Sequence, residues 1–256
     1  MRRFLSDVAV IAERNLIRVP RSPELLLAFT VQPIMFVLLF RYVFGGAIRV
    51  PSGISYAEFL IPGIVVQNIS FGGFTTALGI NEDMNKGLID RFRSLPMSRA
   101  AVMAGRTLAD VFTNLLGMGI LVGTGLLIGF SFHTSVGRAL AGVGLLVLFG
   151  YAFSWFFALV GLLVRTPEAA NSAGFIAVFP LTFISSAFVP VASMPAALRA
   201  FARVNPFTIV VDALRSLWIG LPARSYVWEA VAWAVGIIAV FSLLAVARYK
   251  RAAARA

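Results

Sequence analysis

Long apolar blocks alternate with short polar connections along this chain, and six of the blocks have the length of a membrane span. A transmembrane helix needs roughly 20 predominantly apolar residues to cross a hydrocarbon core of about 30 Å. The pattern therefore predicts an all-α membrane protein with six transmembrane helices. These spans are expected at residues 25–44, 59–80, 111–130, 139–164, 173–189 and 231–247.

The segment before the first block, residues 1–24, has an amphipathic pattern. Apolar residues such as Phe4, Val8 and Leu16 recur near helical spacing, and arginines lie between them. A helix of this kind is typical of the membrane interface, where its apolar face enters the acyl boundary and its arginines meet lipid headgroups. We expect an N-terminal amphipathic interfacial helix on the cytoplasmic side.

Two connections are longer than a helix bundle requires. Residues 81–110 form the cytoplasmic one, and residues 190–226 form the outer one. The outer connection has Asn205 and Pro206 as a helix N-cap and N1 pair. Apolar residues then share one helix face, with Asp212 and Arg215 opposite, and this face consists of Phe207, Val210, Val211, Leu214, Leu217 and Trp218. At about 15 residues the helix is too short to span, so we expect a re-entrant or interfacial helix in the outer leaflet, braced by its own protein.

The basic residues indicate the topology. With the N-terminus inside, most of the 22 Lys and Arg residues fall on the cytoplasmic side, as the positive-inside rule requires. We therefore expect a single multi-pass domain over residues 1–256 with both termini cytoplasmic. The formal net charge of +11 sits in short clusters between apolar blocks, so it is interpreted as a topology signal and not as a nucleic-acid surface.

Composition excludes most catalytic chemistry. Hydrophobic residues make up 59% of the chain and charged residues 13%, whereas soluble domains carry about 25% charged residues. There is no cysteine and one histidine, His133, which is expected to be an ordinary loop residue with no carboxylate partner. Lys86 and Lys250 do not fit a phosphate-binding loop, so any ATP hydrolysis must come from another polypeptide. We expect no catalytic, cofactor-binding or metal-binding residues.

Aromatic residues on the second and fifth spans are the candidate substrate path. Gln67, Phe71 and Phe74 share one helix face, and Phe175, Phe179 and Phe183 recur every four residues. The alternative for such faces is lipid contact or packing in the bundle. Asp110, at the inner edge of the third span, is either a structural residue at the helix start near Arg106 or an ion-coupling group.

Three stretches resemble one family. They are YAEFLIPGIVVQ (Tyr56 to Gln67), NEDMNKGLIDRFRSLPMSR (Asn81 to Arg99) and the stretch from Phe183 to Arg215. Their order among six spans is similar to that of ABC-2 type permeases, the membrane subunits of ATP-driven exporters, and within them to the daunorubicin-resistance type of actinobacteria. The resemblance implies that the cytoplasmic segment docks on an ABC ATPase subunit. The implied contact residues are Glu82, Asp83, Lys86, Gly87, Asp90, Arg91, Arg93, Leu95, Pro96 and Arg99.

The resemblance also implies an assembly and a site plan. Two permease copies, identical or related, would join two ATPase chains that bind ATP and Mg²⁺, with the path where the second and fifth spans of the copies face each other. Asn205, Pro206, Asp212 and Arg215 would frame an external gate. The expected function is export of an amphiphilic or hydrophobic compound, such as a drug, antibiotic or lipid-like molecule, across a bacterial plasma membrane. An ion-gradient-driven secondary transporter and a non-transporting scaffold are the alternatives.

Overall fold

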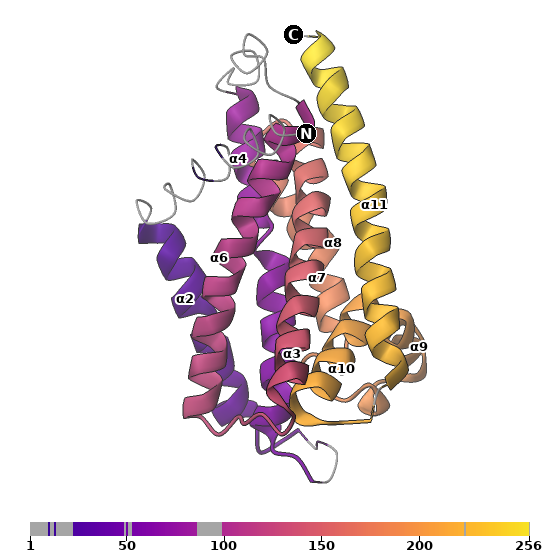
Figure 1. Cartoon of the computed structure of the whole chain (residues 1–256). Helices are drawn as coiled ribbons and strands as arrows, with labels where there is room; N and C mark the ends of the chain where they lie inside the picture. Colours follow the sequence, from indigo (N-terminus) through magenta and orange to yellow (C-terminus); the bar gives the residue numbers. More distant parts are fainter. Residues whose placement is uncertain are drawn as a thin grey trace.

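The computed structural model describes residues 23–48, 50, 53–85, 99–222 and 224–255, together with Val10 and Glu13. These residues form helices and connections, with no strand among them (Figure 1). Four helical segments are long and apolar enough to cross a membrane: Tyr56–Met84, Ala104–Leu127, Val136–Leu163 and Tyr226–Tyr249. The described part of the chain is thus all-helical, with four candidate membrane spans. The expected interfacial helix over residues 1–24 lies almost wholly outside the described residues.

The first described helix, α2, covers Pro23–Leu38 and passes directly into a π-helix, η2, at Leu39–Phe44. Together they cover the block expected at residues 25–44. The apolar part of this helix that can be assessed, Val31–Phe44, is shorter than a full span.

The second candidate span is built from two helices, α3 (Tyr56–Phe71) and α4 (Phe74–Asn85), which are separated by Gly72 and Gly73. A Cβ at Gly72 would lie 2.0 Å from the Asn114 side-chain oxygen, and one at Gly73 would lie 2.4 Å from the Phe157 ring. The two glycines therefore allow neighbouring helices to approach the break.

Helices α6 (Arg99–Leu127), α7 (Val136–Leu163) and α11 (Arg224–Arg255) supply the other long spans. Helix α7 is central and packs against α4, α6, α10 and α11. The candidate span Ala104–Leu127 starts before the block expected at residues 111–130 and therefore contains Asp110.

The remaining helices are short. Helix α8 covers Pro167–Phe183, η3 covers Val191–Ser193, α9 covers Ala196–Val204 and α10 covers Pro206–Ile219. Helices α9 and α10 lie at the lower end of the molecule, opposite the end where α4 and α11 finish (Figure 1). Helix α10 is buried on almost every side and packs on α3, α7 and α11. It is therefore enclosed by its own protein, including the polar side expected at Arg215.

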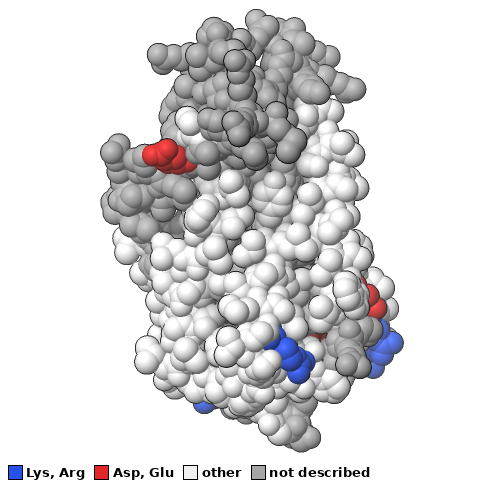
Figure 2. All heavy atoms as spheres, in the orientation of Figure 1, with Lys and Arg blue, Asp and Glu red and all other residues white. Residues whose placement is uncertain are grey.

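Charged groups avoid the middle of the surface on the face shown in Figure 2. The visible Lys, Arg, Asp and Glu side chains lie toward the two ends, and the described surface between them carries none. A surface of this kind is suited to a hydrocarbon environment.

Candidate functional site

The lower end of the bundle is tied together by one buried guanidinium, that of Arg215 on α10. It is 2% exposed. Its Nη2 donates to the backbone oxygens of Phe59 on α3, at 2.7 Å, and of Ser186, which follows α8, also at 2.7 Å. Its Nε also donates to Phe59 O at 3.1 Å, and the guanidinium carbon lies 3.5 Å from the centre of the Phe59 ring. One side chain thus joins three separate segments.

A second layer of polar groups holds Arg215 in place. Asp212 accepts from Arg215 Nη1 at 2.9 Å and from the Ser186 hydroxyl at 2.8 Å. The Thr208 hydroxyl accepts from the backbone N–H of Ser186 at 3.1 Å. We call Thr208, Asp212, Arg215 and Ser186 the outer clasp. The sequence pointed to Asp212 and Arg215 but did not relate Ser186 or Thr208 to them, because these contacts depend on the tertiary structure.

Asn205 and Pro206 form the helix start that the sequence predicted. The Asn205 side-chain oxygen accepts from the backbone N–H of Phe207 at 2.9 Å, and Pro206 occupies the first turn of α10. The Asn205 side-chain nitrogen donates to Leu181 O and Ile184 O, at 2.6 and 2.7 Å. The cap therefore also holds the end of α8 against the start of α10.

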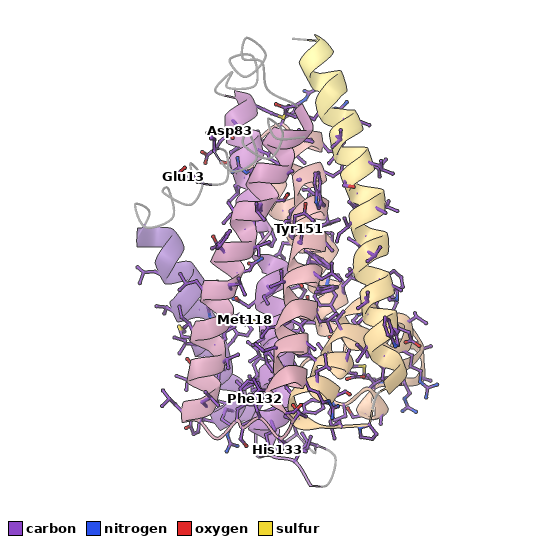
Figure 3. The ribbon with its side chains drawn as sticks, in the orientation of Figure 1. Glu13, Asp83, Met118, Phe132, His133 and Tyr151 are labelled. Carbon is purple, nitrogen blue, oxygen red and sulfur yellow. The ribbon has the colours of Figure 1, made fainter. Side chains whose placement is uncertain are left out.

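The expectation for His133 was wrong on one point, because the histidine has a carboxylate neighbour. Its Nε2 lies 3.1 Å from Glu58 Oε1 and 3.0 Å from the Ser131 hydroxyl, at the lower end of the molecule (Figure 3). A hydrolase triad needs the acid and the serine on opposite ring nitrogens. Here both face the same nitrogen, and Glu58 also caps α3 by accepting from the backbone N–H of Ser55. The cluster joins the α6–α7 loop to α3 and is not a catalytic triad.

The predicted aromatic faces meet in one continuous row of rings. Phe71 stacks on Phe74 at 5.5 Å and contacts Phe175 at 6.0 Å, both between ring centroids. Phe175, Phe179 and Phe183 then stack along α8 at 4.8 and 4.2 Å. The structure thus joins the second-span residues to the fifth-span residues.

The row continues beyond the predicted residues. Phe183 stacks on Phe188 at 5.0 Å, and Phe188 stacks on Phe40 of η2 at 4.5 Å. Neither residue could be found from helical spacing, because Phe188 lies past the end of α8 and Phe40 belongs to another helix. We call the whole set the aromatic row. It consists of Phe71, Phe74, Phe175, Phe179, Phe183, Phe188 and Phe40.

Exposure differs along this row. Phe175 is 49% exposed and Phe179 is 38% exposed, whereas Phe188 is buried. Gln67, one turn before Phe71 on α3, is buried as well. Phe175 and Phe179 on α8 therefore offer an open aromatic surface, whereas Phe188 and Gln67 lie deeper in the bundle.

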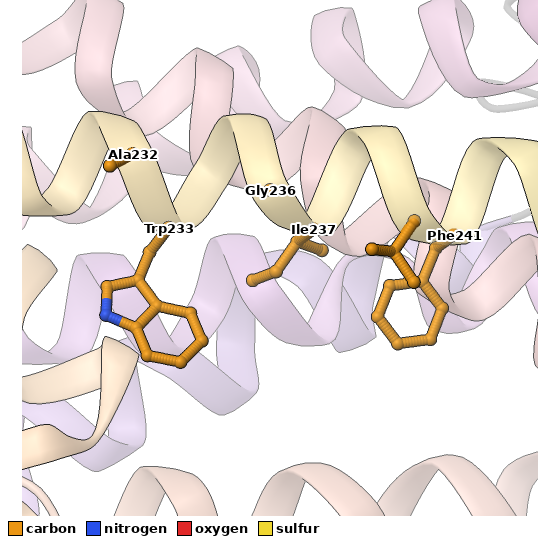
Figure 4. A pocket seen from close by; sticks show the side chains of 6 residues that line it. Ala232, Trp233, Gly236, Ile237 and Phe241 are labelled. Atoms are coloured by element: carbon orange, nitrogen blue, oxygen red, sulfur yellow. The ribbon is translucent and has the colours of Figure 1, made fainter.

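A shallow apolar groove of about 470 Å³ runs along α11 (Figure 4). It is lined by Ala232, Trp233, Gly236, Ile237, Val240 and Phe241. Because all its lining residues belong to one helix, it is a surface feature and not an enclosed cavity.

A polar cluster lies between α4 and α6, nearer the upper end. Arg106 Nη1 pairs with Asp83 Oδ2 at 2.7 Å, and Arg106 Nη2 donates to Thr75 O at 3.4 Å. One turn further along α6, Asp110 accepts a hydrogen bond from the Thr76 hydroxyl. Asp83 is labelled in Figure 3, near the end of α4. The cluster holds α4 on α6.

Most of the proposed ATPase contact residues lie outside the described part of the chain. This applies to Lys86, Gly87, Asp90, Arg91, Arg93, Leu95 and Pro96, and only the backbone of Arg99, in the first turn of α6, is described. Glu82 and Asp83 lie in the last turns of α4, which ends at Asn85, directly before the residues outside the described part.

Comparison with known proteins identifies the family. Residues 6–219 match the ABC-2 type transporter family. The chain is 32% identical over 228 residues to the daunorubicin resistance ABC transporter permease protein DrrB1 of Streptomyces coeruleorubidus, covering 89% of this chain and 80% of that protein. It is 24% identical over 251 residues to the probable doxorubicin resistance ABC transporter permease protein DrrC of Mycobacterium tuberculosis, covering 98% and 91%.

A more distant relative is the inner membrane transport permease YadH of Escherichia coli, which is 24% identical over 193 residues, or 73% of this chain and 72% of that protein. The family match covers most of the chain, so the protein belongs to the ABC-2 type transporter family. The predicted resemblance is confirmed, and the chain is a membrane permease homologous to subunits of drug-resistance ABC transporters.

Proposed function

We propose that this chain is the permease subunit of an ATP-driven exporter that moves an amphiphilic or hydrophobic compound out of a bacterial cell. A separate ABC ATPase subunit would bind ATP and Mg²⁺ and hydrolyse the nucleotide. The family match supports the permease role. The relatives named for daunorubicin and doxorubicin resistance support a drug or antibiotic as substrate, with lipid-like molecules as the wider class.

The aromatic row carries the proposal for the path. It joins α4, α3, α8 and η2 in a chain of ring contacts, and its α8 section is open to the outside of this copy. Stacked and edge-on ring contacts each contribute about 0.5–1.5 kcal/mol beyond area burial, and they tolerate many aromatic partners. In a pair of permease copies, identical or related, the row and Gln67 of each copy would line a shared path for an amphiphile.

We further propose that α2 with η2, and α8 with the residues after it, complete a six-span topology. Their apolar residues cover the blocks expected at residues 25–44 and 173–189. Helices α9 and α10 would then lie as a re-entrant segment in the outer leaflet of a bacterial plasma membrane, with both termini cytoplasmic. The enclosure of α10 supports this, since non-spanning backbone at membrane depth must be buried in protein.

In this arrangement the outer clasp acts as the frame of the external gate. Arg215, Asp212 and the Asn205–Pro206 cap link α10 to α3 and to the end of α8. Because α3 and α8 both carry part of the aromatic row, a movement of α10 would be transmitted to the path.

The ATPase contact would be the segment that follows Glu82 and Asp83. Reversing the charges of Asp90, Arg91 and Arg93 together tests this role. The triple variant should insert normally but co-purify with less ATPase subunit than the wild type does. The matched control is Arg203→Glu, a reversal on exposed α9 at the opposite end, which should leave co-purification unchanged. Undiminished co-purification of the triple variant would remove these residues from the interface.

An ion-gradient-driven transporter is the second candidate, and it is favoured by one observation. Asp110 lies inside the candidate span Ala104–Leu127, where ionisable residues commonly serve ion pathways. Such a transporter would stop when the proton or sodium gradient is collapsed and would ignore ATP. Transport by the exporter would continue when these gradients are collapsed and would require ATP.

A further inference from the structure

Helix α11 lies at the edge of the bundle, and most of its surface faces outward (Figure 1). In its most apolar stretch 17% of the residues are buried, against 72% in the candidate span Tyr56–Met84. The groove of about 470 Å³ on α11 is lined only by apolar and aromatic side chains and one glycine. Its volume falls within the range of about 300–1,000 Å³ that small-molecule sites occupy.

The floor of the groove is Gly236. A Cβ at this position would meet no atom of the described residues within 4 Å, so the glycine leaves open space and does not serve the packing of the bundle. Trp233 lies one turn before it and Val240 one turn after it, and they are 43% and 54% exposed. At the far end the Phe241 ring packs edge-on against Phe156 of α7, with 5.2 Å between ring centroids. The groove therefore runs along α11 from Trp233 to Phe241 (Figure 4).

The groove has the length of one membrane leaflet. Glu229 and Arg248 bracket residues 230–247, which carry no charge and rise about 27 Å, close to a hydrocarbon core of about 30 Å. The groove residues, 232–241, begin at the Glu229 side of this block and rise about 14 Å. Trp233 lies at that side, and tryptophan favours the boundary between headgroups and hydrocarbon. The groove thus extends from near the headgroups to about the middle of the bilayer, as one acyl chain does.

A carboxylate lies at the headgroup end of the groove. Glu229 is exposed and precedes Trp233 by four residues and Gly236 by seven, so it shares their face of α11. Acidic and basic side chains lie close together at the lower right of Figure 2, near the end where α11 begins in Figure 1. This pattern suits a headgroup that carries both an ammonium and a phosphate group. A negative charge at this level attracts the ammonium group and disfavours a lipid with net negative charge.

A second transmembrane helix fits this groove less well than an acyl chain. Close pairs of membrane helices need small residues at successive four-residue steps along the contact. Ala232 and Gly236 supply one such step, but Val240 ends it. Trp233 and Phe241 stand on the same side of the helix and would hold a second backbone away. A flexible acyl chain can enter between them.

We propose that this groove binds one acyl chain of a phospholipid with an amine-bearing headgroup, in the leaflet where α11 begins. The chain lies over Gly236, between Trp233 and Phe241, and the ammonium group lies at Glu229. The site does not depend on the exporter function, on its substrate or on which side of the membrane this leaflet faces.

Photolabelling tests the acyl-chain site. The purified chain is reconstituted in phosphatidylglycerol vesicles with a trace of phosphatidylethanolamine that carries a photoreactive diazirine on one acyl chain. Peptide mass spectrometry should find the adducts concentrated on residues 232–241. Gly236→Leu fills the groove and should lower this labelling about tenfold. The control Gly144→Leu, on α7, also points into open space and should change nothing. Adducts spread evenly over the exposed helices, or equal labelling in the two variants, would overturn the proposal.

The headgroup is tested with the same diazirine chain on phosphatidylglycerol. Phosphatidylethanolamine should label residues 232–241 about threefold more strongly, which is the size expected of an exposed charge pair. Glu229→Gln should remove this preference, and the control Glu168→Gln, an exposed acid at the start of α8, should keep it. Equal labelling by the two lipids in the wild type would contradict the role of the amine. Adducts that give way to cross-links between two copies as the protein-to-lipid ratio rises would contradict lipid as the occupant.

Discussion

Replacing Arg215 should loosen the lower end of the bundle, as drawn in Figure 1, more than any other single change in the clasp. Arg215→Met keeps most of the side-chain length and removes the guanidinium. It breaks the contacts with Phe59 O and Ser186 O, the ion pair with Asp212 and the contact with the Phe59 ring. Hydrogen bonds from charged groups are worth about 1.5–3 kcal/mol each, but they are not additive.

Breaking a buried ion pair by removing one partner costs about 3–5 kcal/mol, and this range is the expected loss for Arg215→Met. Arg215→Lys should lose about half as much, because a single ammonium cannot reach carbonyls on two segments with a fork of donors. The matched control is Arg138→Gln on α7. Arg138 donates one bond to Ser216 O of the same helix α10 at 2.7 Å, but Arg138 is exposed and water can replace this bond, so its loss should cost no more than about 1 kcal/mol.

The assay is unfolding of the purified chain in mixed detergent, followed by tryptophan fluorescence, since buried Trp218 lies on α10. The expected order of stability is wild type, then Arg138→Gln, then Arg215→Lys, then Arg215→Met. If Arg215→Met were as stable as Arg138→Gln, Arg215 would not hold the three segments together, and the clasp would have no structural basis.

Two further changes test the packing and the path. Gly63→Ala should lower the free energy of unfolding by about 1–3 kcal/mol in the same assay, because its Cβ would lie 2.1 Å from Ala187 O. The control Gly144→Ala should cost nothing, because a Cβ there meets nothing within 4 Å. Equal losses in the two variants would refute the close approach of α3 to residue 187. Phe179→Ala interrupts the aromatic row, so the amphiphile concentration that half-maximally stimulates the ATPase should rise about tenfold. Ile176→Ala, on the same helix but outside the row, should leave this concentration unchanged. The same shift in both variants would remove the row from the path.

Local patterns predicted the parts of the site that lie within one helix. The four-residue spacing of Phe175, Phe179 and Phe183 places their rings on one face of any α-helix, and the structure stacks them. The Asn205–Pro206 pair predicted the start of α10 for the same reason, because N-caps depend on neighbouring residues.

Contacts between distant segments could not be predicted in this way. Phe40 of η2 joins the aromatic row, and Glu58 of α3 contacts His133 in the loop between α6 and α7. Neither spacing nor hydropathy relates these positions. Arg215 was expected on a polar face, but its partners are backbone carbonyls of α3 and of the segment after α8, which any residue could supply. The sequence therefore placed Arg215 on this helix without indicating that it is buried or what it binds.

The location of Asp110 shows the limit of hydropathy for span boundaries. The charges of Arg106 and Asp110 lower the local hydropathy, so the apolar block begins after them. In the structure both side chains are buried against α4, where Gly79 leaves room for the Arg106 guanidinium. Pairing and hydrogen bonding make these positions tolerable inside the bundle, and a hydropathy average does not register such contacts.

The most direct test of the exporter function is ATP-driven transport in proteoliposomes that contain this chain and an ABC ATPase subunit from the same genome. Each subunit alone serves as a control, and a panel of fluorescent amphiphiles is tested with the proton and sodium gradients collapsed. The account predicts that at least one amphiphile moves only when both subunits and ATP are present. Movement that needs an ion gradient and ignores ATP would contradict it and would establish the ion-driven alternative.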